Sequence, residues 1–321
     1  MRRWLLAALL ALFAVPASAQ TAAGQTDRPI RVIMPLAAGS AVDVVVRIVA
    51  ERMGETLGQR LAIENMTGAS GMIGMRTGAR AAPDGLTLLA VNDAVLTMLP
   101  NMNSQAGYDP LKDFAPIGQI VRIRWALVAH PSFAATTVPA LIEAARARPG
   151  QIDYASGGAG SPQHVAMEMF LQATGLRMNH ISYRGATPAL TAVTAGQVPV
   201  GFFGLPTPNA FVRDGQLRLL GTAGPARIDT FPDAPTIAES VPGFTFHTWG
   251  AFLAPAGTPA PVVARINGAL REAVNHAPVR SRLEQLGYEV VGNTPEAFAA
   301  ALASDHATMG TLIRSANITM E

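Results

Sequence analysis

Two glycine-rich turns, one in each half of the chain, each stand between a strand-like run and a helical pattern. The first turn, residues 35–40, follows the apolar run 30–33 and reads Pro-Leu-Ala-Ala-Gly-Ser. The second turn, residues 156–161, follows the run 152–155 and reads Ser-Gly-Gly-Ala-Gly-Ser. Such a turn aims free backbone N–H groups and the positive end of a helix dipole at one point, which suits a carboxylate. The repeated pattern therefore favours an α/β chain whose two helix ends share one small anion.

Each turn ends in a serine that can cap the following helix. Ser40 with Asp43 fits a capping box, and Ser161 precedes Pro162, whose missing N–H costs nothing at the first helical position. Glycine and serine are also common in ordinary strand-to-helix connections, so either turn alone has a purely structural explanation. The glycines exceed what one cap needs in both halves, and this excess favours ligand binding.

Apolar runs alternate with helical patterns after residue 27, which predicts an α/β fold with largely parallel sheets. A hydroxyl residue before proline marks four predicted helix starts, at Ser161, Thr187, Thr258 and Thr294. The predicted strands are 30–34, 61–64, 86–91, 117–121, 125–129, 152–156, 179–183, 198–203, 217–222, 251–254 and 288–291. The predicted helices are 41–57, 139–148, 162–174, 188–195, 259–275 and 295–315.

Two extended stretches mark the predicted domain boundaries. Residues 117–130 hold two strand-like runs in succession, and residues 244–254 are extended between Pro-Gly and proline. If both stretches cross between domains, residues 27–125 and 249–321 form the first domain and residues 126–248 the second. The predicted hinge is then a pair of strands.

Residues 1–19 have the pattern of a secretory signal peptide. Arg2 and Arg3 precede an apolar run over residues 4–15, and residues 17–19 read Ala-Ser-Ala, a cleavage site of small residues. We expect an exported, periplasmic protein that begins at Gln20. The chain has no cysteine, so it has no lipid-attachment site and no disulfide.

Charge and motifs exclude several function classes. Without Arg2 and Arg3, 22 basic residues balance 22 acidic ones, which argues against nucleic-acid or anionic-membrane binding. The only lysine is Lys112, so a phosphate loop is absent, and residues 68–74 lack dinucleotide spacing and are predicted to form a third loop at the cleft rim. The histidines lack metal-ligand spacing, and no paired acid and base or activated nucleophile is evident. We therefore expect no metal, no cofactor and no catalysis.

Three charged or titratable residues have competing interpretations. His164 falls near the third position of its helix and either contacts the ligand or is a surface residue like the other histidines. Asp43 holds the same place on the first helix, where capping its own helix is the favoured role. Arg184, in a third strand-to-helix turn at 183–188, either reaches the cleft or stays solvated.

Six motifs follow one another along the mature chain. Residues 35–43 fit P-F-P-P-G-G-x-x-D with changes, 64–74 fit E-N-x-x-G-A-x-G-x-x-G, and 81–89 fit A-x-P-D-G-x-T-L-L. The others are 154–157 with Gly160, Ser161 and His164, then 183–185 and 253–259. In this order they resemble the extracytoplasmic solute receptors of tripartite tricarboxylate transporters, the Bug or TctC-type family.

This resemblance implies a periplasmic binding protein fold, with two α/β domains that close on a carboxylate, and delivery to membrane permease subunits. It implies a non-catalytic monomer whose turns bind ligand largely through backbone N–H groups and waters. The predicted ligand-binding residues are Leu36, Ala37, Ala38, Gly39, Ser40, Asn92, Ser156, Gly157, Gly160, Ser161, His164, Arg184, Phe203 and Gly204.

Departures from the family pattern bear on the ligand. Leu36, Ala37 and Ala38 replace the aromatic residue and prolines of the first turn, and Ser40 replaces a glycine. Gly204 stands where relatives often carry an aspartate that can hold an amino group, so an acid without an ammonium group is favoured. A ligand sensor that docks on a membrane signalling protein remains an alternative, and a periplasmic enzyme is a less favoured one.

Overall fold

The computed structural model describes residues 28–315 and 318, so the predicted signal peptide lies outside the described residues. Strands follow the order β2-β1-β3-β9-β4-β7-β5-β6 in one continuous path, while β8 and β10 pair with β4 beside it. Their bounds are β1 (Ile30–Met34), β2 (Leu61–Asn65), β3 (Thr87–Asn92), β4 (Phe114–Ala129), β5 (Asp153–Ser156), β6 (Asn179–Ser182), β7 (Val200–Gly204), β8 (Arg218–Thr222), β9 (His247–Pro255) and β10 (Tyr288–Val290).

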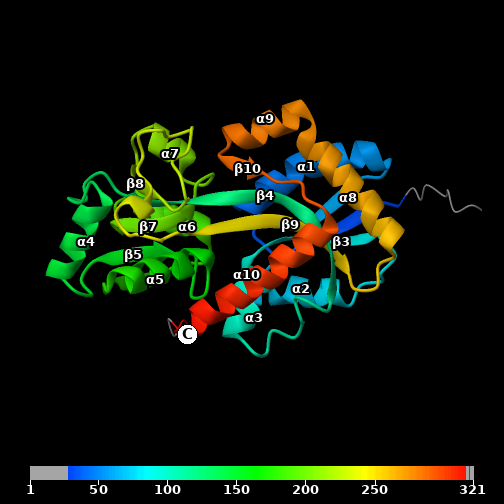
Figure 1. Ribbon diagram of the computed structural model, residues 1–321, viewed down its shortest axis with the longest axis horizontal. Coiled ribbons are helices and arrows are strands. Elements are labelled where there is room, and N and C mark those ends of the chain that lie inside the picture. The colour runs from blue at the N-terminus through cyan, green and yellow to red at the C-terminus, as the bar shows by residue number, and fades with distance from the viewer. Residues whose placement is uncertain (1–27, 316–317, 319–321) are drawn as a thin grey trace, which may run out of the picture.

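Helices divide between two lobes, which β4 and β9 join (Figure 1). In the first lobe, around β1–β3 and β10, they are α1 (Ala41–Leu57), α2 (Met72–Ala79), α3 (Leu99–Met102), α8 (Ala260–Asn275), α9 (Ala277–Gln285) and α10 (Pro295–Ser315). In the second lobe, around β5–β8, they are α4 (Val138–Ala147), α5 (Pro162–Thr174), α6 (Ala186–Thr194) and α7 (Asn209–Arg213). None of these described helices is long and apolar enough to cross a bilayer.

The predicted α/β architecture is confirmed, with parallel pairing concentrated in each lobe. β1 pairs in parallel with β2 and β3, and β5 pairs in parallel with β6 and β7. Every pair that involves β4 or β9 is antiparallel. The apolar run of β1 is almost entirely buried, as expected for a parallel strand covered on both faces.

One long strand stands where the sequence predicted two. The runs 117–121 and 125–129 belong to β4, whose 16 residues pair with β9 through two register shifts before they reach β7. Arg122 and Arg124 interrupt the apolar pattern, but both pair with Glu289 of β10, at 2.7 and 3.2 Å. The strand continues because its backbone pairs with β9 as far as Arg124 and with β10 over residues 121–123. The predicted boundaries at 125/126 and 248/249 fall inside β4 and β9.

The cap predictions were right at three helix starts and wrong at two. Ser40, Ser161 and Thr294 accept the N–H groups of the residues three positions later. Thr187 lies inside α6, which Gly185 precedes. The Thr258 hydroxyl instead donates to the Pro255 carbonyl, so α8 begins after Pro259 without a side-chain cap.

Residues 68–74 are not a simple loop, which corrects the prediction of a third loop there. A short 3-10 turn at Ala69–Gly71 leads into α2. A Cβ at Gly74 would lie 2.8 Å from the Met66 carbonyl, and one at Gly78 would lie 2.3 Å from the Leu89 side chain. These glycines are therefore required for the close packing of α2 on the sheet.

Candidate functional site

Each glycine turn lies at the carboxyl end of a parallel strand, where ligands bind in open α/β sheets. In the first lobe the turn after β1 lies between Asn65, which ends β2, and Asn92, which ends β3. Ala37, Ala38 and Gly39 are exposed there, and the Oδ1 atom of half-buried Asn92 is buried without a hydrogen-bond partner in the described structure.

In the first turn, the backbone is held by hydrogen bonds of its own. Gly39 has a positive φ of 77°, and its N–H donates to the Asp43 carboxylate at 2.9 Å. The Ser40 N–H donates to the Ala37 carbonyl, and the Ser40 hydroxyl accepts the Asp43 N–H. Asp43 therefore caps its own helix, as predicted. Its carboxylate accepts the N–H of Gly39, whereas in a standard capping box it would accept the N–H of the cap residue, Ser40.

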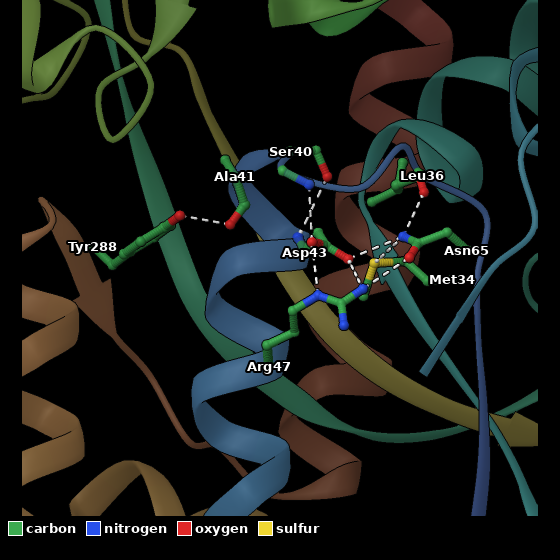
Figure 2. A network of polar contacts seen from close by, with 9 residues as sticks. Met34, Leu36, Ser40, Ala41, Asp43, Arg47, Asn65 and Tyr288 are labelled. Atoms are coloured by element: carbon green, nitrogen blue, oxygen red, sulfur yellow. Dashed lines mark hydrogen bonds and ion pairs between the residues drawn. The ribbon is translucent and has the colours of Figure 1, made fainter. Parts of the chain in front are cut away.

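A network around Asp43 fixes this turn to the neighbouring strand (Figure 2). The buried carboxylate accepts two hydrogen bonds from Arg47, at 2.9 and 3.0 Å, and one from Asn65 at 2.9 Å. Asn65 also donates to the Leu36 carbonyl. Burial alone raises the pKa of Asp43, but the hydrogen bonds from Arg47, Asn65 and Gly39 outweigh it and hold the pKa below its ordinary value. The first helix N-terminus therefore already holds an anion.

The second turn repeats the first bond by bond. Gly160 has a φ of 70°, and its N–H donates to Nδ1 of His164 at 3.0 Å. The Ser161 N–H donates to the Gly158 carbonyl, and the Ser161 hydroxyl accepts the His164 N–H. The caps match in conformation, with φ and ψ of −66° and 159° at Ser40 and −67° and 157° at Ser161. His164 thus takes the place that Asp43 holds in the first turn.

A second histidine lies against His164. The ring of His180, on β6, is 4.2 Å from that of His164 between centroids, with planes 7° apart. Its Nε2 is 2.5 Å from the hydroxyl of Ser156, and that hydroxyl accepts the Gly158 N–H. Burial lowers the pKa of His164 to about 4, with a further contribution from His180. Burial also lowers the pKa of His180.

His180 was missed from the sequence, which placed it among surface or edge residues. It reaches the second turn because β5 and β6 pair in parallel with Tyr154 opposite His180 and Ser156 opposite Ser182. The one signal in the sequence that His180 lies near the site was its place in a strand that leads into the third turn. That place does not reveal that its ring stacks on His164. Tyr154 stacks on His180 at 5.0 Å and donates its hydroxyl to Glu168.

Backbone hydrogen bonds join the third turn, residues 183–188, to the second turn. The Tyr183 N–H donates to the Ser156 carbonyl and the Gly185 N–H to the Gly157 carbonyl. Arg184 is exposed and makes no hydrogen bond or ion pair within the described residues. Gly157 is packed so closely that a Cβ would lie 3.0 Å from the Ala186 nitrogen.

The donors available to a ligand differ from those expected. The N–H groups of Gly39, Ser40, Gly160 and Ser161 all donate within their own turns, so the expectation of free N–H groups is wrong for these four residues. Pro162, the first residue of α5, has no backbone N–H to donate. Within the described chain, the N–H groups without a protein acceptor at these two helix starts include those of Ala41, Val42, Gly157, Ala159 and Gln163.

Two residues that end β7 complete the predicted set. Phe203 is fully buried and its ring packs against the Gly201 backbone, so its side chain belongs to the core of the second lobe. Gly204 pairs with Trp125 of β4, and a Cβ there would lie 3.0 Å from Ile123.

The register of β4 sets the spacing between the two halves of the site. Gly250 pairs with Val121 and packs against Val42 in the first turn of α1. Gly204 pairs with Trp125, four residues further along β4. At about 3.3 Å per residue, these two pairing positions are about 13 Å apart along the strand.

Two hollows of the described surface lie away from the two turns. Each has a volume of about 610 Å³, and they lie beside Gly58, at the end of α1, and beside Gly175, at the end of α5. Neither includes a residue of the two turns, so cavity size does not locate this site. No group of three or more metal-ligating side chains occurs among the described residues.

Comparison with known proteins gives matches over nearly the whole chain. The sequence profile described as "Tripartite tricarboxylate transporter family receptor" matches residues 45–318. A UPF0065 protein of Bordetella bronchiseptica is 34% identical over 318 residues, which cover 99% of this chain and 93% of that protein.

Solved structures agree in fold. The periplasmic binding protein BugD superposes with a TM-score of 0.85 at 31% identity, over 92% of this chain and 100% of its own. Rpa4515 of R. palustris, solved with adipate, has a TM-score of 0.87 at 28% identity, over 91% and 98%. MatC of Rhodopseudomonas palustris, with bound malate, has a TM-score of 0.83 at 28% identity, over 89% and 99%.

Proposed function

Because this chain belongs to the tripartite tricarboxylate transporter receptor family, a family of solute-binding receptors, we propose that it binds a small carboxylate between its two lobes in the periplasm. The observation that carries this proposal is the pair of matched turns, each at the carboxyl end of a parallel strand and each with unpaired N–H groups at a helix start. Such groups stabilise a carboxylate without a dedicated arginine.

The ligand set follows from these turns. Leu36 to Ser40 and Asn92 contribute from the first lobe, and the second lobe contributes Ser156, Gly157, Gly160, Ser161, His164, Arg184 and Gly204. Two relatives of this fold were solved with dicarboxylates, adipate and malate, which supports the same ligand class here. The small apolar side chains of the first turn and the missing carboxylate at Gly204 favour an acid without an ammonium group.

Delivery to the membrane permease subunits of this transporter class is the proposed output, with the receptor acting as a monomer and without catalysis. We also propose that the two domains expected from the sequence, residues 27–125 with 249–321 and residues 126–248, close on the ligand, with β4 and β9, the strands that join the two lobes, as the hinge.

A thermal-shift panel on the mature protein tests ligand binding. It includes adipate, malate and other dicarboxylates, and adipamide as the neutral control of the same length. We expect at least one acid to raise the unfolding temperature and its diamide to leave it unchanged. Equal stabilisation by acid and diamide, or by no member of the panel, contradicts a carboxylate receptor.

A further inference from the structure

The two halves of the site differ in charge although their hydrogen bonds match. In the first turn, the acceptor for the glycine N–H is the anionic Asp43, which Arg47 neutralises. In the second turn, the acceptor is an imidazole nitrogen of His164. A ligand carboxylate near Asp43 meets an existing anion, whereas the N-terminus of α5 has none in its first turn.

The hydrogen bond at Gly160 fixes the protonation of His164. A backbone N–H can only donate, so Nδ1 must accept, and the ring's proton is on Nε2. That nitrogen lies 3.8 Å from the Glu168 carboxylate. A protonated ring would bring its own N–H against the Gly160 N–H and would lose this bond.

His180 supports the same turn from its other end. Its Nε2 contacts the Ser156 hydroxyl, which accepts the Gly158 N–H. The two stacked rings therefore hold Gly158 and Gly160, the residues on either side of the free Ala159 N–H. Among the described residues, Glu168 of α5 and Tyr154 of β5 are the other ionisable groups in ion-pair, hydrogen-bond or stacking contact with the pair.

We propose that His164 and His180 are positioning residues which, as neutral imidazoles, hold the second turn in the shape that receives the ligand carboxylate. This inference rests on the proposed carboxylate function. It also assigns the carboxylate to the second turn rather than the first, because Asp43 already occupies the N-terminus of α1. Burial, which lowers the pKa of both rings, is consistent with the neutral state.

An amide side chain can take over the hydrogen-bonding position of one chosen ring nitrogen in each histidine. Asparagine places an acceptor where Nδ1 of a histidine lies, and glutamine places one where Nε2 lies. His164→Asn should therefore keep the Gly160 bond, and His180→Gln should keep the contact with Ser156. His164→Asp recreates the acceptor of the first turn with an added charge, and His180→Phe keeps a stacked ring without the nitrogen. His276→Asn, at an exposed residue before α9, is the control.

Adipate binding to the mature variants is measured by calorimetry. We expect near wild-type affinity in His164→Asn, His180→Gln and His276→Asn, and a loss of about tenfold in His164→Asp and His180→Phe. We compare the adipate association constant of the wild type with that of His164→Asn at each pH. Their ratio should fall as the pH approaches the His164 pKa of about 4, because only the wild type has a ring to protonate. Titration of adipate affects both proteins equally and does not change the ratio. A constant ratio, or unchanged affinity in His164→Asp, overturns the proposal.

A ligand-free measurement separates this inference from the proposed function. In the apo protein, ¹⁵N NMR should show His164 protonated on Nε2 at neutral pH, and a Gly160 amide protected from exchange until that ring titrates. If the NMR result holds and no carboxylate binds, the function is wrong and the turn geometry right. If His164 carries its proton on Nδ1, the positioning role is wrong whatever the protein binds.

Discussion

Asp43 and His164 make the same hydrogen bond in the two halves of the molecule: each accepts the N–H of the glycine four residues before it, at 2.9 and 3.0 Å. Both follow a capping serine by three residues, and both glycines have positive φ. The backbone requirement is therefore identical in both turns. The side chains differ in charge, which gives the two turns different responses to pH and to a bound anion.

Stability should fall in mild acid because of His164. Its pKa in the folded protein is about 4 and its unfolded value 6.5, so below about pH 6.5 the unfolded chain takes up a proton that the folded chain does not. We expect about 2–3 kcal/mol less free energy of unfolding at about pH 4.5 than at about pH 7 from this residue. Urea unfolding measures it, and the loss should shrink in His164→Asn. Equal losses in both proteins contradict the assignment.

Replacement of Asp43 should destabilise the first lobe. Asp43→Ala leaves the Gly39 and Asn65 donors without their acceptor in a buried place, and we expect a cost of about 2–4 kcal/mol. Arg47→Ala should cost less than about 1 kcal/mol, because the Arg47 side chain is 48% exposed. Denaturant unfolding of both variants gives the comparison. A larger effect from Arg47→Ala would mean that the ion pair, not the turn, carries the energy.

A methyl group at Gly39 tests whether the first turn faces the ligand. Gly39→Ala meets no atom within 4 Å, so its cost comes from the positive φ alone, about 1 kcal/mol. Gly175→Ala is the matched control, with a positive φ and open space at the far end of α5. We expect similar stability losses in both variants and, by calorimetry, weaker ligand binding only in Gly39→Ala, because the exposed first turn faces the part of the ligand that lies beyond the carboxylate held by the second turn. Unchanged binding there places the ligand away from the first turn.

Amino acids should bind less well than matched acids without the amine. Gly204 offers no carboxylate, and an ammonium buried without a partner costs several kcal/mol. Calorimetry with glutamate and glutarate compares the same skeleton, and we expect glutarate to bind about a hundredfold more tightly. Tighter binding of glutamate would show that another residue, such as the unpartnered Asn92 side chain, holds the amino group.

Export should remove residues 1–19. The charged start at Arg2 and Arg3 and the Ala-Ser-Ala sequence predict cleavage after Ala19. The intact mass of protein from a periplasmic fraction decides this, with the cytoplasmic fraction of the same cells as the control. A periplasmic species that retains Met1 would show that this segment has another role.

The sequence by itself was enough for the α/β class, for the serine caps at Ser40 and Ser161 and for most strands, because periodicity and capping are local properties. The sequence-based prediction was wrong where contacts with residues elsewhere in the structure determine the bounds of a strand or helix. The sequence predicted two strands, 117–121 and 125–129, where pairing with β9 and β10 makes the single strand β4. The helix start at Thr187 was wrong because α6 begins after Gly185, and the start at Thr258 was wrong because that hydroxyl donates to the Pro255 carbonyl.

For the candidate site, the sequence determined which turns carry the glycines, the serines and the residue three positions after each cap. Only the tertiary structure decided that the glycine N–H groups are already occupied and that His180 lies on His164. The stacking of His180 on His164 depends on the parallel register of β5 with β6, which pairs residues 26 positions apart in the chain. Register depends on the fit of a buried face across strands, and a single strand's own pattern does not contain it.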